Sequence, residues 1–184
     1  MTLRQMATLS LNLIIGAAVG LPAAAHGQDA TPSEYQMKAA YLYNFAKYVD
    51  WPAAALPDHA PLVIGVFGDD PFGGALDEIL HNKVISGHTL MARHFALLRD
   101  VTNCQVLFIS GSEKKHWPEI LKTLQGSSVL TVSENWDQFT QGGGMIYFFM
   151  EERRVCFDIN DSAARQANLN VSSKLIQLRK KPSA

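Results

Sequence analysis

Residues 62–67 read LVIGVF, an unbroken apolar run, and residues 68–73 continue it with the turn-forming sequence GDDPFG. A short run rich in β-branched residues, without alternating polar positions, is typical of a strand that is buried on both faces. Similar runs follow at 106–109 (VLFI) and 129–132 (VLTV). Such strands occur in parallel sheets that helices cover on both sides, so this stretch decides the fold class.

Segments with helical patterns follow these runs in turn, at residues 74–81, 113–125 and 133–139. Strands that alternate with helices predict a parallel sheet. Near the C-terminus, residues 145–150 and 155–159 flank a polar turn and predict an antiparallel hairpin. We therefore expect a single-domain, three-layer α/β fold with a mostly parallel sheet, helices on both faces and a C-terminal antiparallel hairpin.

The segment before the first strand, residues 35–52, reads YQMKAAYLYNFAKYVDWP and is unusually aromatic. Apolar residues recur there at spacings of four and three, as on one stripe of a helix: Tyr35, Ala39, Leu42, Ala46 and Val49. The helix should end near Trp51, because the residue before a proline is pushed out of the helical region. The preceding residues 31–34 (TPSE) have the spacing of a capping box with Thr31 as the cap.

Several aromatic rings of this helix lie off the apolar stripe. They either close over the protein's own sheet or meet a second copy of the chain, and the sequence leaves both alternatives open. For the second alternative we expect Tyr41, Phe45 and Tyr48 to carry self-association into a homodimer.

The N-terminus has the pattern of a secretory signal peptide over residues 1–25. Arg4 is its one charge, residues 9–21 are almost wholly apolar, and Ala23 to Ala25 offer a small-residue cleavage site. Residues 26–184 then form one exported domain, which we expect in the bacterial periplasm. The 184-residue chain carries a formal net charge of −1, so nothing in its overall charge favours nucleic acid as a partner.

The sequence shows no complete catalytic or metal-binding constellation. Asp69 and Asp70 follow the first strand, where paired acids can hold magnesium, but the strand at 106–109 is followed by Ser110 instead of an acceptor carboxylate. The two acids are better interpreted as a turn. The six histidines contain no i, i+4 ligand pair. We therefore expect a protein that is not an enzyme and that needs no metal or other cofactor.

Cys104 and Cys156 are the two cysteines of the chain. In an oxidising compartment they could pair as a disulfide, and they could equally be two free thiols, because sequence does not show whether their Cα atoms lie within reach.

The C-terminal segment from Asn160 to Arg179 is locally basic and rich in apolar residues. Such basic residues complement the dipole of a final helix, or they form a docking surface for an acidic partner or a membrane. For partner contact we single out six residues of this segment: Asn160, Arg165, Leu169, Lys174, Leu175 and Arg179.

The sequence resembles the YfiR family of periplasmic proteins. The matching residues cover nearly the whole exported chain in order, at 38–47 (KAAYLYNFAK), 51–52 (WP), 68–73 (GDDPFG), 107–110 (LFIS), 129–133 (VLTVS), 142–146 (GGGMI), 157–160 (FDIN), 163–165 (AAR) and 172–175 (SSKL). The resemblance implies a compact, dimeric α/β domain at residues 26–184. It also implies a regulator that binds the periplasmic region of an inner-membrane diguanylate cyclase of the YfiN type and inhibits it, so that release raises cyclic di-GMP and promotes biofilm growth. An OmpA-like outer-membrane lipoprotein would sequester the regulator.

The cysteines depart from that family pattern, in which relatives can carry two disulfides. Phe149 stands where a hairpin cysteine would pair with Cys156, so the resemblance does not carry redox control over to this chain. An alternative function is a periplasmic small-molecule-binding sensor. Its cleft would lie near Gly68 to Phe72, where the carboxyl ends of parallel strands collect ligands.

Overall fold

The computed structural model describes residues 32–136 and 138–181, so the signal peptide expected at residues 1–25 lies outside the described residues. In the described part of the chain, no helix combines the length and the apolar character that a membrane crossing requires. The fold is a single mixed α/β domain with a mostly parallel sheet, as the sequence predicted.

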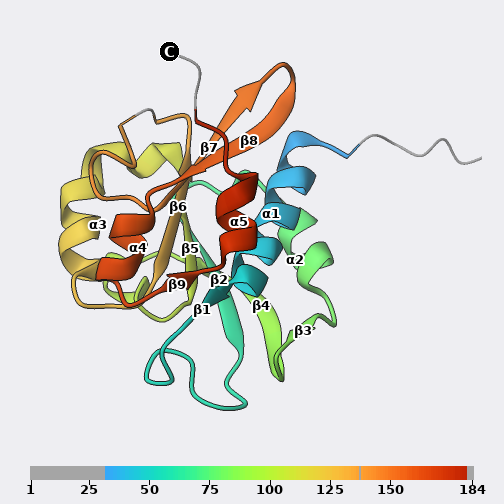
Figure 1. The fold of residues 1–184 in the computed structure, drawn as a ribbon, viewed down its shortest axis with the longest axis vertical. Coiled ribbons are helices and arrows are strands. Elements are labelled where there is room, and N and C mark those ends of the chain that lie inside the picture. Colours follow the sequence, from blue (N-terminus) through green and yellow to red (C-terminus); the bar gives the residue numbers. More distant parts are fainter. Residues whose placement is uncertain (1–31, 137, 182–184) are drawn as a thin grey trace, which may run out of the picture. The chain divides into compact units, whose positions relative to one another are not determined.

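Within the described residues, seven strands form the main sheet, in the order β3-β4-β2-β5-β6-β7-β8 (Figure 1). Their bounds are β2 Leu62–Phe67, β3 Val84–Ile85, β4 His88–Phe95, β5 Val106–Ile109, β6 Leu130–Glu134, β7 Ile146–Glu151 and β8 Arg154–Ile159. The five strands from β4 to β7 in that order run parallel, while β3 and β8 are antiparallel at the two edges. Every residue of β2 and β5 is buried, which explains their unbroken apolar sequences.

Helices cover both faces of this sheet, as expected for three layers. One face packs against α1 (Glu34–Tyr48), α2 (Ala75–Leu80), α4 (Asp161–Gln166) and α5 (Ser173–Leu178). The other face packs against α3 (Trp117–Leu124), which lies beside the 3₁₀ turns η1 (Leu98–Asp100) and η2 (Gly111–His116). A small second sheet pairs β1 (Val49–Asp50) with β9 (Asn170–Val171) and thereby fixes the end of α1 next to the C-terminal segment.

The cap of α1 differs from the sequence prediction. Ser33, and not Thr31, is the N-cap: its hydroxyl accepts a hydrogen bond from the Gln36 amide, and the Gln36 side chain accepts one from the Ser33 amide. The capping box is therefore shifted by two residues, because Ser33 offers the same chemistry with glutamine in the third helical position.

The segment at 133–139 also differs from the prediction, which expected a short helix there. Strand β6 continues through Ser133 to Glu134, and residues 138–140 form a turn. The Ser133 hydroxyl donates to the carbonyl oxygen of Ile109 at 2.8 Å instead of capping a helix. Tertiary pairing with β5 and β7 thus outweighs the local capping signal.

The C-terminal hairpin forms where it was expected, from β7 and β8. The two residues between the strands, Glu152 and Arg153, have φ values of 47° and 63°. Two consecutive positive φ angles are the backbone of the tight hairpin turn whose twist matches that of the strands. The hairpin projects from the edge of the sheet next to α1 (Figure 1).

Candidate docking surface

An aromatic cluster joins α1 to the C-terminal hairpin. The Phe45 ring stacks on Phe148 with 5.5 Å between centroids and meets Phe157 edge-on at 5.1 Å, and Phe45 is 0% exposed. Phe45 therefore fills the protein's own core and offers no surface for self-association, contrary to the expectation that named it with Tyr41 and Tyr48. Of the two alternatives for the aromatic flank, closure over its own sheet holds for this ring.

Tyr41 and Tyr48 differ from Phe45 because both are half-buried. Tyr41 lies at the margin of the cluster, 5.3 Å from the Phe157 ring, and Tyr48 packs on the edge of the same core beneath the ammonium of Lys47. Their partly exposed rings leave self-association through Tyr41 and Tyr48 as a prediction.

Three of the six C-terminal residues expected to contact a partner have structural roles. Leu169 and Leu175 are 2% and 1% exposed and belong to the core. The Asn160 side chain caps α4, accepting from the Ala163 amide at 3.1 Å, while its amide nitrogen donates to the Thr140 carbonyl at 2.8 Å. These three side chains hold the segment in place and are not free to bind a partner.

The other three residues, Arg165, Lys174 and Arg179, are exposed. Arg165 forms an ion pair with Asp161 one helical turn earlier, as is common on helix surfaces. Arg179 ends α5 and begins the tail that crosses to strand β8, where the Lys180 amide donates to the Phe157 carbonyl at 2.8 Å. Arg179 is thus the member of this set that stands next to the hairpin.

A cavity of about 250 Å³ opens where α1, β8 and this tail meet. We call its lining the docking surface, and it consists of Tyr41, Arg154, Val155, Cys156, Phe157, Leu178 and Lys180. Leu178 is 66% exposed, the largest exposed fraction among the large apolar side chains of the described residues. Met150, the cross-strand partner of Val155, is 43% exposed. Exposed apolar side chains beside a cavity formed by separate elements make this surface a candidate protein-binding site.

The rim of the docking surface is basic. Arg154 and Lys180 line the cavity, and Arg153, Arg179 and Lys181 adjoin them in the chain; together with Glu151 and Glu152 they make five cations against two carboxylates. Lys180 pairs with Glu151, and Arg154 pairs with Glu152 at 3.1 Å. The cations outnumber the acids, so the rim attracts an acidic partner.

The two cysteines are free thiols in this structure. Cys104 is buried just before β5, and its thiol donates to the Val101 carbonyl at 3.3 Å. Burial raises the pKa of the Cys104 thiol to about 12. Cys156 lies half-buried on β8, three strands away in the sheet order. Neighbouring strands are about 4.8 Å apart, so the two Cα atoms lie beyond the reach of a disulfide.

The loops at the strand ends expected to hold a ligand cleft contact each other. Asp70 accepts a hydrogen bond from the Phe72 amide at 2.8 Å, as a turn residue does, and the Asp69 amide donates to the Ser112 hydroxyl at 3.1 Å. A Cβ added to Gly68, whose φ is 90°, would lie 2.6 Å from that hydroxyl. The loops after β2 and β5 therefore touch where a ligand would have entered. In the described part of the chain, no group of three potential metal ligands was found.

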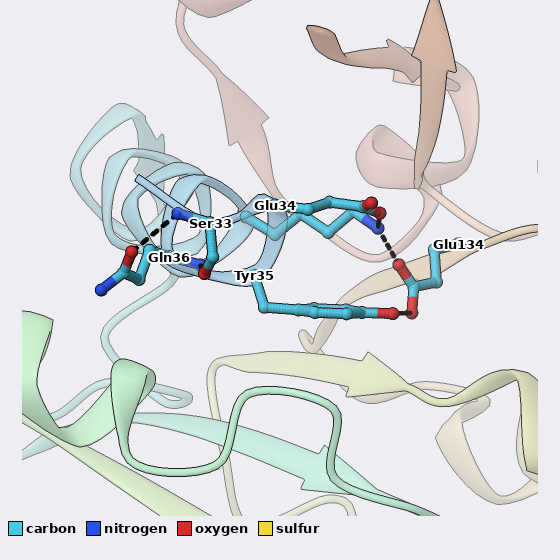
Figure 2. A network of polar contacts seen from close by, with 6 residues as sticks. Ser33, Glu34, Tyr35, Gln36 and Glu134 are labelled. Carbon is cyan, nitrogen blue, oxygen red and sulfur yellow. Dashed lines mark hydrogen bonds and ion pairs between the residues drawn. The ribbon is translucent and has the colours of Figure 1, made fainter. Parts of the chain in front are cut away.

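A buried polar network that the sequence analysis did not predict lies at the start of α1 (Figure 2). The Lys38 side chain is 1% exposed, and its ammonium forms ion pairs with Glu34 and with Glu134, which is 5% exposed at the end of β6. The Tyr35 hydroxyl donates to Glu134 at 3.1 Å. Burial, and then the charge of Glu134, raise the pKa of Tyr35 to about 12. The network ties α1 to the sheet. The i, i+4 spacing of Glu34 and Lys38 predicts only a surface ion pair.

A second and larger cavity, of about 480 Å³, lies between α3 and α4. Its walls are mainly apolar, with Leu121, Val129, Met145 and Ala167 among them, and Lys122 is the one ionisable residue in its lining. This volume falls within the range of small-molecule sites. The cavity lies away from the strand ends at which the sequence suggested a cleft.

No curated protein sequence matches the chain significantly. Residues 35–180 match the family described as YfiR/HmsC-like, and this range contains α1 from its second residue on, the whole main sheet and every residue of the docking surface. The chain therefore belongs to the YfiR/HmsC-like family.

Proposed function

We propose that this chain is a non-catalytic periplasmic protein that binds and inhibits an inner-membrane diguanylate cyclase, and so controls cyclic di-GMP and biofilm formation. The YfiR/HmsC-like family implies a regulator of this kind and not an enzyme. The observation that carries the proposal is that the family match spans a surface where exposed apolar side chains, a cavity and basic residues lie together.

Inhibition by docking has a thermodynamic requirement. The regulator must bind the inactive conformation of the cyclase more tightly than the active one, since equal affinity for both would shift nothing. The apolar centre formed by Tyr41 and Leu178 would supply binding energy, and the basic rim would speed encounter with an acidic sensor region.

The proposal has three further parts. Residues 1–25 direct export to the periplasm as a cleavable signal peptide. The protein acts as a homodimer, with Tyr41 and Tyr48 contributing to self-association. An OmpA-like outer-membrane lipoprotein sequesters the protein and so relieves the cyclase.

A pull-down from detergent-solubilised inner membranes tests the proposal, with the purified exported chain as bait and mass spectrometry as the readout. We expect a diguanylate cyclase among the captured proteins, and we expect Leu178→Glu to lose it. Val84→Glu is the matched control, because Val84 is 57% exposed on the opposite edge of the sheet. If wild-type bait captures no cyclase, or if both variants behave alike, the proposal fails.

The 480 Å³ cavity favours a second candidate function, a periplasmic small-molecule-binding sensor. A metabolite that fills this cavity should raise the melting temperature of the exported chain, because a ligand that binds only the folded state stabilises it. Ala167→Trp, which places an indole in the cavity, should abolish that rise. A metabolite panel without any shift would remove this candidate and leave the docking proposal untouched.

A further inference from the structure

The register of the hairpin determines which backbone groups of β8 face outward. The Asn160 amide donates to the Met145 carbonyl, and these residues continue the antiparallel register in which Tyr147 faces Asp158 and Phe149 faces Cys156. Hydrogen-bonded pairs alternate with non-bonded pairs along an antiparallel ladder. Asp158, Cys156 and Arg154 therefore bond to β7, whereas Val155, Phe157 and Ile159 direct their N–H and C=O groups away from it.

Some of the outward-facing backbone groups of β8 already form hydrogen bonds within the chain. The Phe157 carbonyl accepts from the Lys180 amide at 2.8 Å, and the Ile159 amide donates to the Asp158 side chain at 2.8 Å. The N–H and C=O of Val155 and the N–H of Phe157 have no hydrogen-bond partner within residues 32–136 and 138–181. A strand edge with unpaired donors and acceptors is a template for another strand.

The hairpin also extends past its neighbours. Strand β6 pairs with β7 only as far as Phe148, opposite Glu134, so the distal part of the hairpin stands as a two-stranded ribbon (Figure 1). Two strands alone are marginally stable, and a third strand would bury the ribbon's open edge. The free groups of Val155 lie in this part, beside the cavity of the docking surface.

The side chains beside the free edge of β8 indicate which kind of segment can pair with it. Tyr41 and Leu178 provide apolar contact on one side of Val155, and the basic rim surrounds them. A second copy of the chain would bring the same excess of cations against this rim, and like charges across an interface disfavour that pairing. An extended acidic segment matches both the charge and the unpaired backbone.

We propose that an extended, acidic segment of the protein's partner adds as an eighth strand along β8, with main-chain hydrogen bonds to Val155 and Phe157. This inference rests on the proposed docking function and specifies its binding mode. Backbone hydrogen bonds would supply the affinity, and the basic rim would supply the charge selectivity. The apolar cavity would hold every second side chain of the added strand.

The probe for this mode is a fluorescein-labelled ten-residue peptide in which valine or threonine alternates with glutamate. We expect saturable binding by fluorescence anisotropy, weakening as salt rises, and ¹H–¹⁵N NMR shifts at the Val155 and Phe157 amides. Val155→Pro should weaken binding at least tenfold, since proline removes an N–H that points away from β7 and is tolerated on an edge strand. Val155→Thr, which retains that N–H, is the control.

A second measurement keeps the test decisive if Val155→Pro fails to fold. Peptides N-methylated on one set of alternate amides should lose binding to the wild-type protein, and peptides N-methylated on the other set should retain it. Equal binding of both methylated peptides, or no saturable binding of the parent peptide, would overturn the proposal. A dimeric wild-type protein together with a monomeric Val155→Pro variant would also overturn the proposal, because the edge of β8 would then pair with a second copy of the chain.

Failure of this inference can be told apart from failure of the proposed function. A cell whose chromosomal copy carries Val155→Pro and still represses cyclic di-GMP would reject strand addition and leave the docking function standing. A deletion strain with unchanged cyclic di-GMP would reject the function itself.

Discussion

Lys38 is the residue whose environment departs most from what its sequence neighbours suggest. Its side chain is 1% exposed, and its ammonium forms ion pairs with Glu34 and the buried Glu134. The pair need not add stability relative to an apolar replacement, but removing one partner leaves the other charge buried and uncompensated.

We therefore predict that Lys38→Met lowers the free energy of unfolding by about 3–5 kcal/mol, measured by urea denaturation. Glu34 is the control, since its side chain is 39% exposed, and Glu34→Gln should cost less than about 1 kcal/mol. The double variant Lys38→Met, Glu134→Leu should recover most of the loss. A loss in Lys38→Met no larger than that in Glu34→Gln would contradict this account of the network.

Tyr35 gives the same network a pH signature. Its folded pKa is raised from 10.0 to about 12, first by burial and then by Glu134. The folded state therefore keeps the proton longer than the unfolded state does. The associated stability is present below pH 10 and is lost as the pH rises toward 12.

We predict that Tyr35→Phe makes stability less sensitive to pH between 10 and 12, measured as the urea midpoint at each pH. Cys104, whose pKa is raised from 9.0 to about 12 by burial, contributes a loss of the same sign that begins at lower pH. The variant should therefore retain part of the alkaline decline. If the urea midpoint of Tyr35→Phe falls with pH as steeply as that of the wild type, the raised pKa of Tyr35 does not contribute to stability and this prediction is contradicted.

The cysteines provide a further test at this scale. Burial and the raised pKa should protect Cys104 from alkylation, because the thiolate is the reactive form, whereas Cys156 is half-exposed. We predict that iodoacetamide at pH 8 modifies one thiol per native chain, at Cys156, and both thiols in urea, as peptide mass spectrometry would show. A disulfide-linked monomer, or rapid native labelling of Cys104, would contradict the separation of the two residues.

At the scale of elements, strand β2 depends on Gly65, which interrupts its β-branched sequence. A Cβ at this position would lie 2.4 Å from the Phe95 ring of β4 and 3.1 Å from the Cys104 sulfur. The φ angle of Gly65 is not positive, so the lack of space for a Cβ, and not the backbone conformation, requires glycine here.

We predict that Gly65→Ala destabilises the fold by about 1–3 kcal/mol through overpacking. Phe95→Leu should relieve part of that cost in the double variant, so that a double-mutant cycle gives a favourable coupling. Gly111→Ala is the control, because nothing lies within 4 Å of its added Cβ. Additive costs for Gly65 and Phe95 would rule out the ring contact as the cause.

Elements were predictable where one local signal dominated. Unbroken apolar runs predicted the buried strands. Two strand patterns around a polar turn predicted the hairpin. The helix expected at 133–139 was wrong, because a capping serine is outweighed when neighbouring strands can extend β6 to Glu134. Periodicity placed Phe45 on α1, but it could not show that Phe148 and Phe157 would cover the ring.

The candidate site was predictable only in part, for the same physical reason. The C-terminal segment contributes Leu178 to the proposed docking surface, whereas Leu169 and Leu175 proved to be core residues. Leu178, Val155 and Arg154 were missed, since their exposure follows from how β8, α5 and α1 meet. A surface built from three distant segments leaves no contiguous pattern in the sequence.

At the scale of the whole molecule, the sheet has a covered centre and a hairpin, β7–β8, that extends from one edge. The central strands are closed on both faces by helices, and the loops after β2 and β5 contact each other at the strand ends. The docking surface lies where β8, α1 and the tail meet, and the 480 Å³ cavity lies apart from it, between α3 and α4. Such a body suits regulation by docking, in which the partner performs the chemistry.

Intracellular cyclic di-GMP in a deletion strain that carries the gene on a plasmid tests this account most directly. We predict that deletion raises the nucleotide, that wild type and Val84→Glu return it to the parental level, and that Leu178→Glu leaves it high at equal protein abundance. Unchanged cyclic di-GMP in the deletion strain, or full repression by Leu178→Glu, would contradict the account.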